Sequence, residues 1–117
     1  MYRYLALFLT AMIINGEVVA GEYGSGAYFG QGNATCGKVS DMRRGNYLYI
    51  LDLYIAGWAT GINFATPSTY SILGSTDVAS AREYVLKHCA DNPLSGAAEA
   101  LNMLYIELYP KRQQRAP

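Results

Sequence analysis

The chain has 117 residues, with nine basic and nine acidic side chains, so its formal net charge at pH 7 is zero. This length supports one domain. The lack of a basic excess argues against a nucleic-acid-binding protein, and the lack of an acidic excess argues against a DNA mimic. Tyrosine is the unusual component, with eleven residues. Tyrosine either fills a core or serves an aromatic contact surface for a partner.

The N-terminus has the pattern of a secretory signal peptide. Arg3 precedes an unbroken apolar run over residues 5–14, and compact side chains lead up to Ala20. We therefore expect residues 1–20 to be removed and the mature protein to be periplasmic or secreted, without stable membrane insertion. An apolar run of about ten residues is short for a bilayer of ~30 Å. Retention of this segment as an anchor is the alternative.

Two flanking segments of the mature chain are expected to lack regular structure. Residues 21–37 are rich in glycine, which makes ordering costly, and predict a flexible arm. Its aromatic side chains either belong to a loose tail or dock on the domain or a partner. Residues 111–117 predict a polar, frayed tail. The helical domain is therefore expected to span residues 38–110.

The stretch Gly45–Asn63 predicts the longest helix, because its apolar residues recur at spacings of three and four. Further apolar residues widen this face, so we expect most of the helix to be covered and to form the centre of the core. Ser40 is expected to cap a short first turn over residues 41–44.

The second helix is expected to begin at about Asp77 and to close at residues 88–90. Ser75 or Thr76 is the expected N-cap. The segment before it, Phe64–Thr76, predicts a loop pinned to the core by its apolar side chains.

The third helix is expected to use Asn92 as its N-cap, with Pro93 at the first helical position, and to end at Pro110. The expected apolar seam consists of Leu94, Ala97, Ala98, Leu101, Leu104, Tyr105 and Leu108. The three main helices together predict a small all-α domain.

Cys36 and Cys89 are the only cysteines. In an exported protein such a pair most simply forms one disulfide. It would close a loop of about fifty residues and contribute roughly 3–4 kcal/mol. It would also tether the start of the central-helix region to the end of the second helix.

The residues give little support for catalysis. His88 is the only histidine, and the neighbouring Cys89 would point in another direction on a helix and is no nucleophile when oxidised. Asp52 lies in the most apolar helix, either as a buried functional carboxylate or as a residue that faces solvent or pairs with an arginine. Zinc-ligand and phosphate-loop patterns are missing. We predict a non-enzymatic protein with no catalytic residue, metal or cofactor.

Three ordered motifs between Cys36 and Tyr109 carry a resemblance. They are Gly57-Trp58-x-x-Gly61-x-Asn63, Tyr70-Ser71-Ile72-x-Gly74-x-Thr76-Asp77 and His88-Cys89-x-x-Asn92-Pro93-Leu94. This pattern resembles a group of small exported proteobacterial helical proteins. More loosely, it is similar to the HdeA/HdeB acid-stress chaperones and to the Tai-type immunity proteins of type VI secretion.

Each resemblance implies a function. Cys36 and Cys89 resemble the pair that joins helices in the acid chaperones, where a folded inactive dimer would loosen at low pH and bind unfolded clients. In an immunity protein, a protruding loop would enter the active site of an effector, and Phe64–Thr76 is the candidate loop.

These observations lead to a non-enzymatic periplasmic protein-binding module, with an acid-chaperone-like role first. The alternative is an immunity protein or inhibitor of a secreted effector or envelope enzyme. The expected partner-binding residues are Trp58, Asn63, Tyr70 and Asp77. Each also has a structural alternative, in the core, at a helix stop or beside a cap. The expected partners are one protein or unfolded clients, without nucleic acid, and a homodimer stays open.

Overall fold

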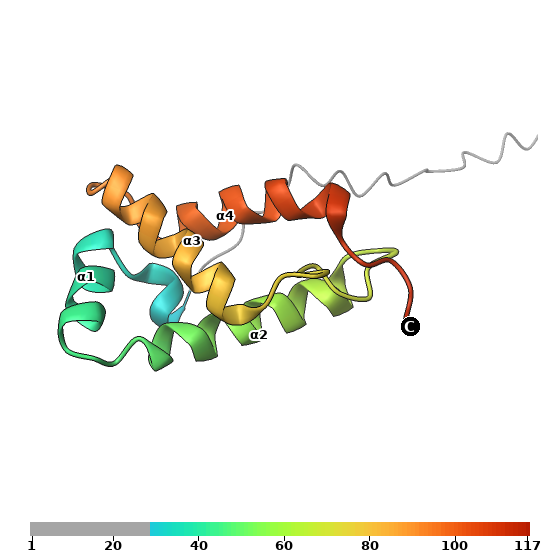
Figure 1. The fold of residues 1–117 in the computed structure, drawn as a ribbon, viewed down its shortest axis with the longest axis horizontal. Helices are drawn as coiled ribbons and strands as arrows, with labels where there is room; N and C mark the ends of the chain where they lie inside the picture. The colour runs from blue at the N-terminus through green and yellow to red at the C-terminus, as the bar shows by residue number, and fades with distance from the viewer. Residues whose placement is uncertain (1–28) are drawn as a thin grey trace, which may run out of the picture.

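A computed structural model describes residues 29–117, which form four α-helices and two short 3-10 helices (Figure 1). In chain order they are η2 (Gly30–Asn33), α1 (Cys36–Arg44), α2 (Tyr49–Ala65), α3 (Val78–Asp91), α4 (Ala97–Leu108) and η3 (Tyr109–Lys111). Within these residues, extended pairing is limited to isolated bridges. The all-α prediction is confirmed, with one helix more than the three expected. The predicted signal peptide and residues 21–28 of the predicted arm lie outside the described residues.

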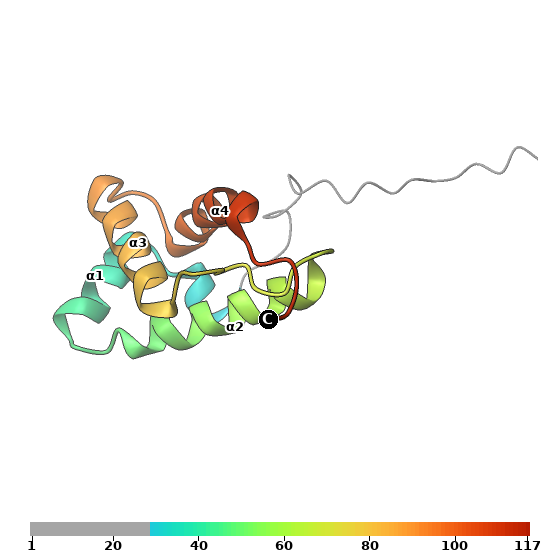
Figure 2. The same ribbon diagram turned by 45° about the vertical axis from the view of Figure 1, so that its right-hand side comes forward.

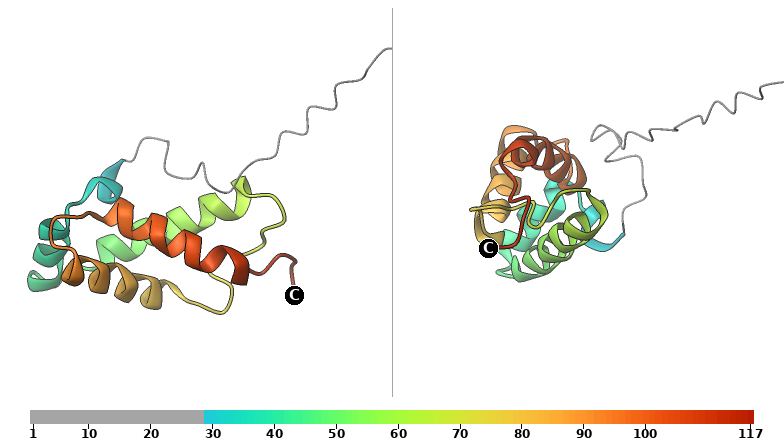
Figure 3. Two further views of the ribbon diagram at one scale, coloured as in Figure 1. Left: turned by 90° about the horizontal axis from the view of Figure 1, so that it is seen from above. Right: turned by 90° about the vertical axis from the view of Figure 1, so that its right-hand side faces the viewer.

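The helix at the centre of the packing is α3. It contacts α1, α2 and α4, while α2 and α4 run along opposite sides of the domain (Figure 1). Seen from above, α4 crosses over α2 at an angle (Figure 3). Two small residues, Ala81 and Val85, are fully buried on α3. Small side chains let neighbouring helices approach closely. Because α3 contacts the other three α-helices, the expectation that Gly45–Asn63 would be the central helix is wrong.

The longest helix, α2, is buried on one side only. Its buried residues are Leu51, Ile55, Ala59 and Ile62, at the spacing of a single helix face. The expectation that most of this helix would be covered is therefore wrong. Of the apolar residues that widen its pattern, Leu53 is 70% exposed, whereas Ile55 is fully buried and Leu48 packs partly buried against the core.

The first helix is longer than predicted. It begins at Cys36 because the side chain of Thr35 accepts a hydrogen bond from the Lys38 N–H at 3.2 Å. The expected cap, Ser40, lies inside this helix. α2 then begins at Tyr49 instead of Gly45, because the intervening residues form a turn in which Asn46 has a φ of 59°. Asparagine tolerates this left-handed conformation better than most residues.

The cap of α3 is Asp77 itself, because its Oδ1 accepts the Ser80 N–H at 2.7 Å. The predicted caps Ser75 and Thr76 are therefore wrong. Asn92 does not start a helix either: it follows the last turn of α3, and its side-chain amide donates to the His88 carbonyl at 3.0 Å.

The last α-helix begins at Ala97, because the loop before it is paired with the segment before α1. The Cys36 N–H donates to the Ser95 carbonyl and the Ala97 N–H donates to the Ala34 carbonyl, each at 2.9 Å. This pairing leaves Leu94 fully exposed, so its predicted place in the apolar seam is wrong.

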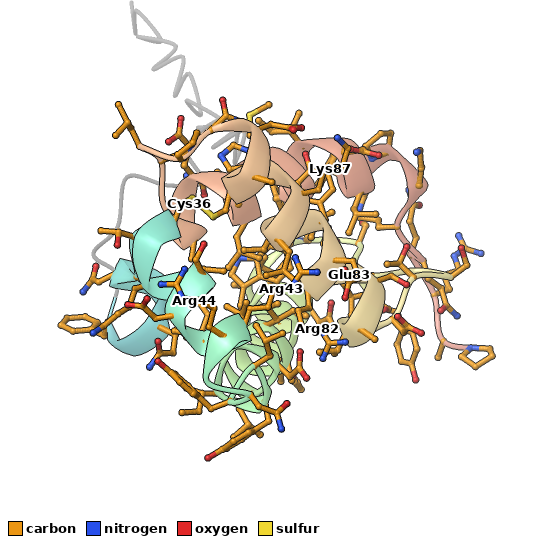
Figure 4. The ribbon with its side chains drawn as sticks, turned by 60° about the vertical axis from the view of Figure 1, so that its left-hand side comes forward. Cys36, Arg43, Arg44, Arg82, Glu83 and Lys87 are labelled. Carbon is orange, nitrogen blue, oxygen red and sulfur yellow. A yellow bond between two sulfur atoms is a disulfide. The ribbon has the colours of Figure 1, made fainter. Side chains whose placement is uncertain are left out.

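The predicted disulfide is confirmed. Cys36 at the start of α1 is bonded to Cys89 in the last turn of α3, with the two Cα atoms 5.0 Å apart (Figure 4). The bond spans a sequence separation of 53 residues. A loop of this length corresponds to about 4 kcal/mol in the chain-entropy estimate.

Candidate functional site

A hollow with exposed aromatic side chains lies at the end of α2. Figure 2 shows how the chain turns there and runs on to α3. Its volume is about 520 Å³. We call it the aromatic pocket, and its lining residues are Asn63, Phe64, Thr69, Tyr70 and Ser71. Phe64 is 89% exposed and Tyr70 is 50% exposed, so both rings are open to a partner.

The loop between α2 and α3, residues 66–77, contributes to the pocket, and we call it the pocket loop. One of its anchors comes from the core. Ile72 is fully buried, and its N–H donates to Oδ1 of Asn63 at 2.7 Å. Asn63 therefore connects the last turns of α2 to the loop that follows. The buried Ile72 side chain and this hydrogen bond fix the loop on the side that faces the core.

A second anchor comes from the C-terminal segment. Ser71 and Gln113 exchange two backbone hydrogen bonds, of 3.0 and 2.9 Å, and the Tyr70 N–H also donates to the Gln113 carbonyl at 2.9 Å. Nε of Arg112 donates to Oγ1 of Thr69 at 2.9 Å. The expectation of a frayed tail is thus wrong for the residues that reach the loop.

The same segment restricts the loop at Gly74. This residue has a φ of 58°, and a Cβ built on it would lie 3.0 Å from the Lys111 carbonyl oxygen. Glycine is the residue that fits both the conformation and the close approach. The pocket loop is therefore held on both of its sides.

The lining of the pocket favours recognition over proton transfer. Its described lining combines two aromatic rings with one amide and two aliphatic hydroxyl groups, and within that part of the lining only the Tyr70 phenol is ionisable. Mostly apolar hollows with a few polar groups are typical binding sites. The pocket suits an aromatic or aliphatic side chain that also makes one or two hydrogen bonds.

The structure brings together two of the four predicted partner-binding residues. Asn63 and Tyr70 line the pocket, whereas Trp58 packs partly buried against the core. Asp77 caps α3, and the hydrogen bond from the Ser80 N–H lowers the pKa of its carboxyl group. Sequence reasoning placed Phe64 in the candidate loop but did not single it out as a contact residue. A phenylalanine at the predicted end of a helix, outside the predicted apolar face, could have indicated an exposed contact residue.

Asp52 forms an ion pair between helices. Its Oδ2 lies 2.8 Å from Nη1 of Arg82 on α3, and both side chains are half-buried. Of the two alternatives for this residue, the structure favours pairing with an arginine. In Figure 4, Arg82 and Glu83 lie on the same side of the molecule as Arg43 of α1. Arg43 is in the last turn of α1, where the helix dipole stabilises a cation.

A polar chain that the sequence analysis missed joins the end of α3 to the start of α4. Nε2 of His88 lies 2.9 Å from Oγ of Ser95, and the Ser95 hydroxyl donates to the carboxylate of Glu99. In a nucleophilic triad the histidine takes the hydroxyl proton and the carboxylate orients the histidine. Here the carboxylate accepts the hydrogen bond of the serine hydroxyl directly. The three side chains therefore link the end of α3 to the start of α4 without the order of a triad.

The remaining tests for a site concern metals and membranes. Residues 29–117 contain no group of three histidine, cysteine or carboxylate side chains placed to hold a metal ion. No helix in that part of the chain is long and apolar enough to cross a bilayer.

Comparison with protein-family models, curated proteins and solved structures finds no match. The resemblance to acid chaperones and immunity proteins therefore stays a prediction. Any functional conclusion has to come from the pocket and its surroundings.

Proposed function

We propose that this protein is a non-enzymatic protein-binding module whose contact surface is the aromatic pocket. One observation carries the proposal: a loop that is anchored on two sides holds Tyr70 open to solvent, beside the exposed Phe64 in the last turn of α2, around a hollow of about 520 Å³. Exposed rings on a fixed backbone cost little entropy on binding, because the loop is already ordered. Tyrosine is also enriched at protein interfaces.

The anchoring favours one specific partner over many clients. Proteins that bind diverse unfolded chains do so through adaptable surfaces, whereas a preorganised loop selects a partner of complementary shape. An inhibitor or immunity protein for a secreted effector or envelope enzyme is therefore the form of the proposal that the geometry supports best. The partner would insert an apolar side chain between the two rings.

A separate observation favours an acid-stress chaperone as the second candidate. Among the described residues, the pair between Asp52 and Arg82 is the ion pair that links two α-helices. Acid weakens carboxylate ion pairs in general. Loss of this link would leave α1 still tethered to α3 by the disulfide. Helices loosened in this way would expose apolar surface to unfolded clients.

Export is part of the proposal. Disulfides persist in oxidising compartments such as the periplasm or the extracellular medium. The bond between Cys36 and Cys89 supports such a location, together with the signal-peptide pattern of residues 1–20.

A crosslinked pull-down from the native envelope fraction separates the two candidates. It would compare neutral pH with about pH 3, which is below the usual carboxyl pKa. One stoichiometric protein captured at neutral pH, lost with Tyr70→Ala and kept with the exposed control Leu94→Ala, would support an inhibitor. Many clients captured only in acid would support the chaperone. Capture of no protein at either pH would contradict the protein-binding proposal.

A further inference from the structure

The outer face of α2 is apolar although it points away from the core. We define it as Tyr49, Leu53, Ala56, Gly57, Thr60, Gly61 and Phe64, which share one side of the helix. Tyr49 is 62% exposed and Leu53 is 70% exposed. Figures 1 and 2 show α3 and α4 on the same side of α2. An ordinary surface helix would carry charged residues here.

Charge on α2 is confined to Asp52, whose side chain pairs with Arg82. The outer face itself therefore carries no charge. A partner on this face needs a matching uncharged, apolar surface. The outer face of a second copy is such a surface.

Two glycines in the middle of the face point to a closely packed partner. Glycine inside a helix costs about 1 kcal/mol relative to alanine. A Cβ built on Gly57 or on Gly61 meets no atom within 4 Å, so nothing inside the described chain requires either glycine. Small residues at i and i+4 allow the backbone of another helix to approach closely.

We propose that the outer face of α2 is a self-association surface, on which α2 of a second copy packs in the antiparallel direction. The face is self-complementary in this direction. Its large residues Tyr49 and Leu53 lie in the first half, and its small residues Thr60 and Gly61 lie in the second half. With the two-fold axis near Gly57, Leu53 of each copy packs on Gly61 of the other, and Tyr49 packs beside Phe64.

Helix dipoles and symmetry fit the same arrangement. Antiparallel helices place the positive end of each dipole beside the negative end of the other. A two-fold axis makes the contact closed, which is the commonest form of homo-oligomer. A parallel pair would instead set Leu53 against Leu53 and glycine against glycine, without the match of large to small residues.

The area of the face predicts a reversible dimer. At about 200 Å² for each aromatic side chain, the exposed fractions of Tyr49 and Phe64 leave roughly 300 Å² open. With Leu53 and the small residues included, a helix pair would bury roughly 1,000 Å² in total, near the lower limit for a specific interface. The dimer should therefore dissociate on dilution.

Sedimentation equilibrium of the protein purified from cells that express the whole chain tests the proposal. Over about a hundredfold range of concentration, we expect a monomer–dimer equilibrium. Leu53→Asp should weaken association by at least about tenfold, because it buries a charge in the contact. Gly61→Leu should weaken association while raising the melting temperature, because leucine is the better helix former and no atom of the chain blocks it.

Two exposed apolar residues outside α2 provide matched controls. Leu94→Asp and Ile106→Asp should leave association unchanged. A monomer at every concentration would overturn the proposal, and so would wild-type association in folded Leu53→Asp and Gly61→Leu. Loss of the dimer in Ile106→Asp alone would assign the contact to α4 and would also overturn it.

The dimer proposal goes beyond the proposed partner binding. Phe64 belongs to both surfaces, so the separate tests use Tyr70, which lies only at the pocket, and Leu53, which lies only on the outer face of α2. Tyr70→Ala should still dimerise, because Tyr70 lies in the loop and not on the outer face of α2. Leu53→Asp should still capture the protein that the wild type captures. Loss of both properties in one folded variant would show that the two surfaces are not independent, and would overturn the assignment of dimerisation to α2 alone.

Discussion

Replacement of Asn63 by alanine tests how the pocket loop is held. The Asn63 side chain supplies the oxygen that accepts the Ile72 N–H at 2.7 Å, and Ile72 is fully buried. Without that oxygen, the buried N–H loses its partner, which costs about 1–3 kcal/mol. We therefore expect Asn63→Ala to lower the free energy of unfolding by that amount. The loop should also open locally, so hydrogen exchange at the Ile72 amide should accelerate.

The assay combines urea unfolding with amide hydrogen exchange. Asn63→Asp is the matched control, because it keeps the acceptor oxygen. Its negative charge near the C-terminal end of α2 should cost about 0.3–1 kcal/mol, which is less than the alanine variant. If Asn63→Ala changed stability by less than about 0.5 kcal/mol, as a neutral surface substitution does, and left exchange at Ile72 unchanged, the hydrogen bond would not hold the loop.

Three further predictions concern the covalent and charged links. Reduction of the disulfide should lower the free energy of unfolding by about 4 kcal/mol, and an unchanged urea midpoint in reductant would contradict this. Asp52→Ala should lower the free energy of unfolding by about 1–3 kcal/mol, which is below the value for a fully buried pair. The additional change Arg82→Met should restore most of that loss. A double variant that is no more stable than Asp52→Ala would show that Arg82 without its Asp52 partner does not cause the loss. Asp77→Asn keeps the cap oxygen but cannot titrate. Because the Ser80 N–H lowers the folded pKa of Asp77 below 3.8, the wild-type advantage over Asp77→Asn in thermal melts should be complete above that pH and disappear as the pH falls through the lower folded value; a constant difference down to about pH 2 would refute it.

The parts of the fold that depend on local pattern were predictable. Apolar spacing predicted the body of α2, and two cysteines in a chain with a signal-peptide pattern allowed a single intramolecular disulfide. The helix starts were harder, because several polar residues competed for each cap. At the start of α3, three consecutive candidates were available, and the extended backbone of Asp77 decided between them.

The start of α4 was mispredicted for a tertiary reason. Asn92 and Pro93 make a good local start signal, but pairing of the following loop with the segment before α1 delays the helix to Ala97. No local property of the loop reveals that pairing. The backbone hydrogen bonds between Ser71 and Gln113 escaped prediction for the same reason, since they join segments that are distant in sequence.

The candidate site was predictable only in outline. The loop was identified by its turn-forming residues. Asn63 and Tyr70, which line the pocket, were among the predicted partner-binding residues. The amphipathic pattern of α2 was misinterpreted, because apolar residues on both sides of a helix look the same whether the second side is covered by the core or left open. Exposed Leu53 and Phe64 could be distinguished from buried neighbours only after α3 had been placed.

Site-specific photocrosslinking at position 70 tests the central claim most directly. A photoreactive aromatic residue in place of Tyr70 would be compared with the same residue in place of the more exposed Leu94, in cells that export the protein. The protein-binding proposal predicts that position 70 captures one defined protein and that position 94 does not. Equal capture at both positions, or capture at neither, would contradict a role for the aromatic pocket in partner binding.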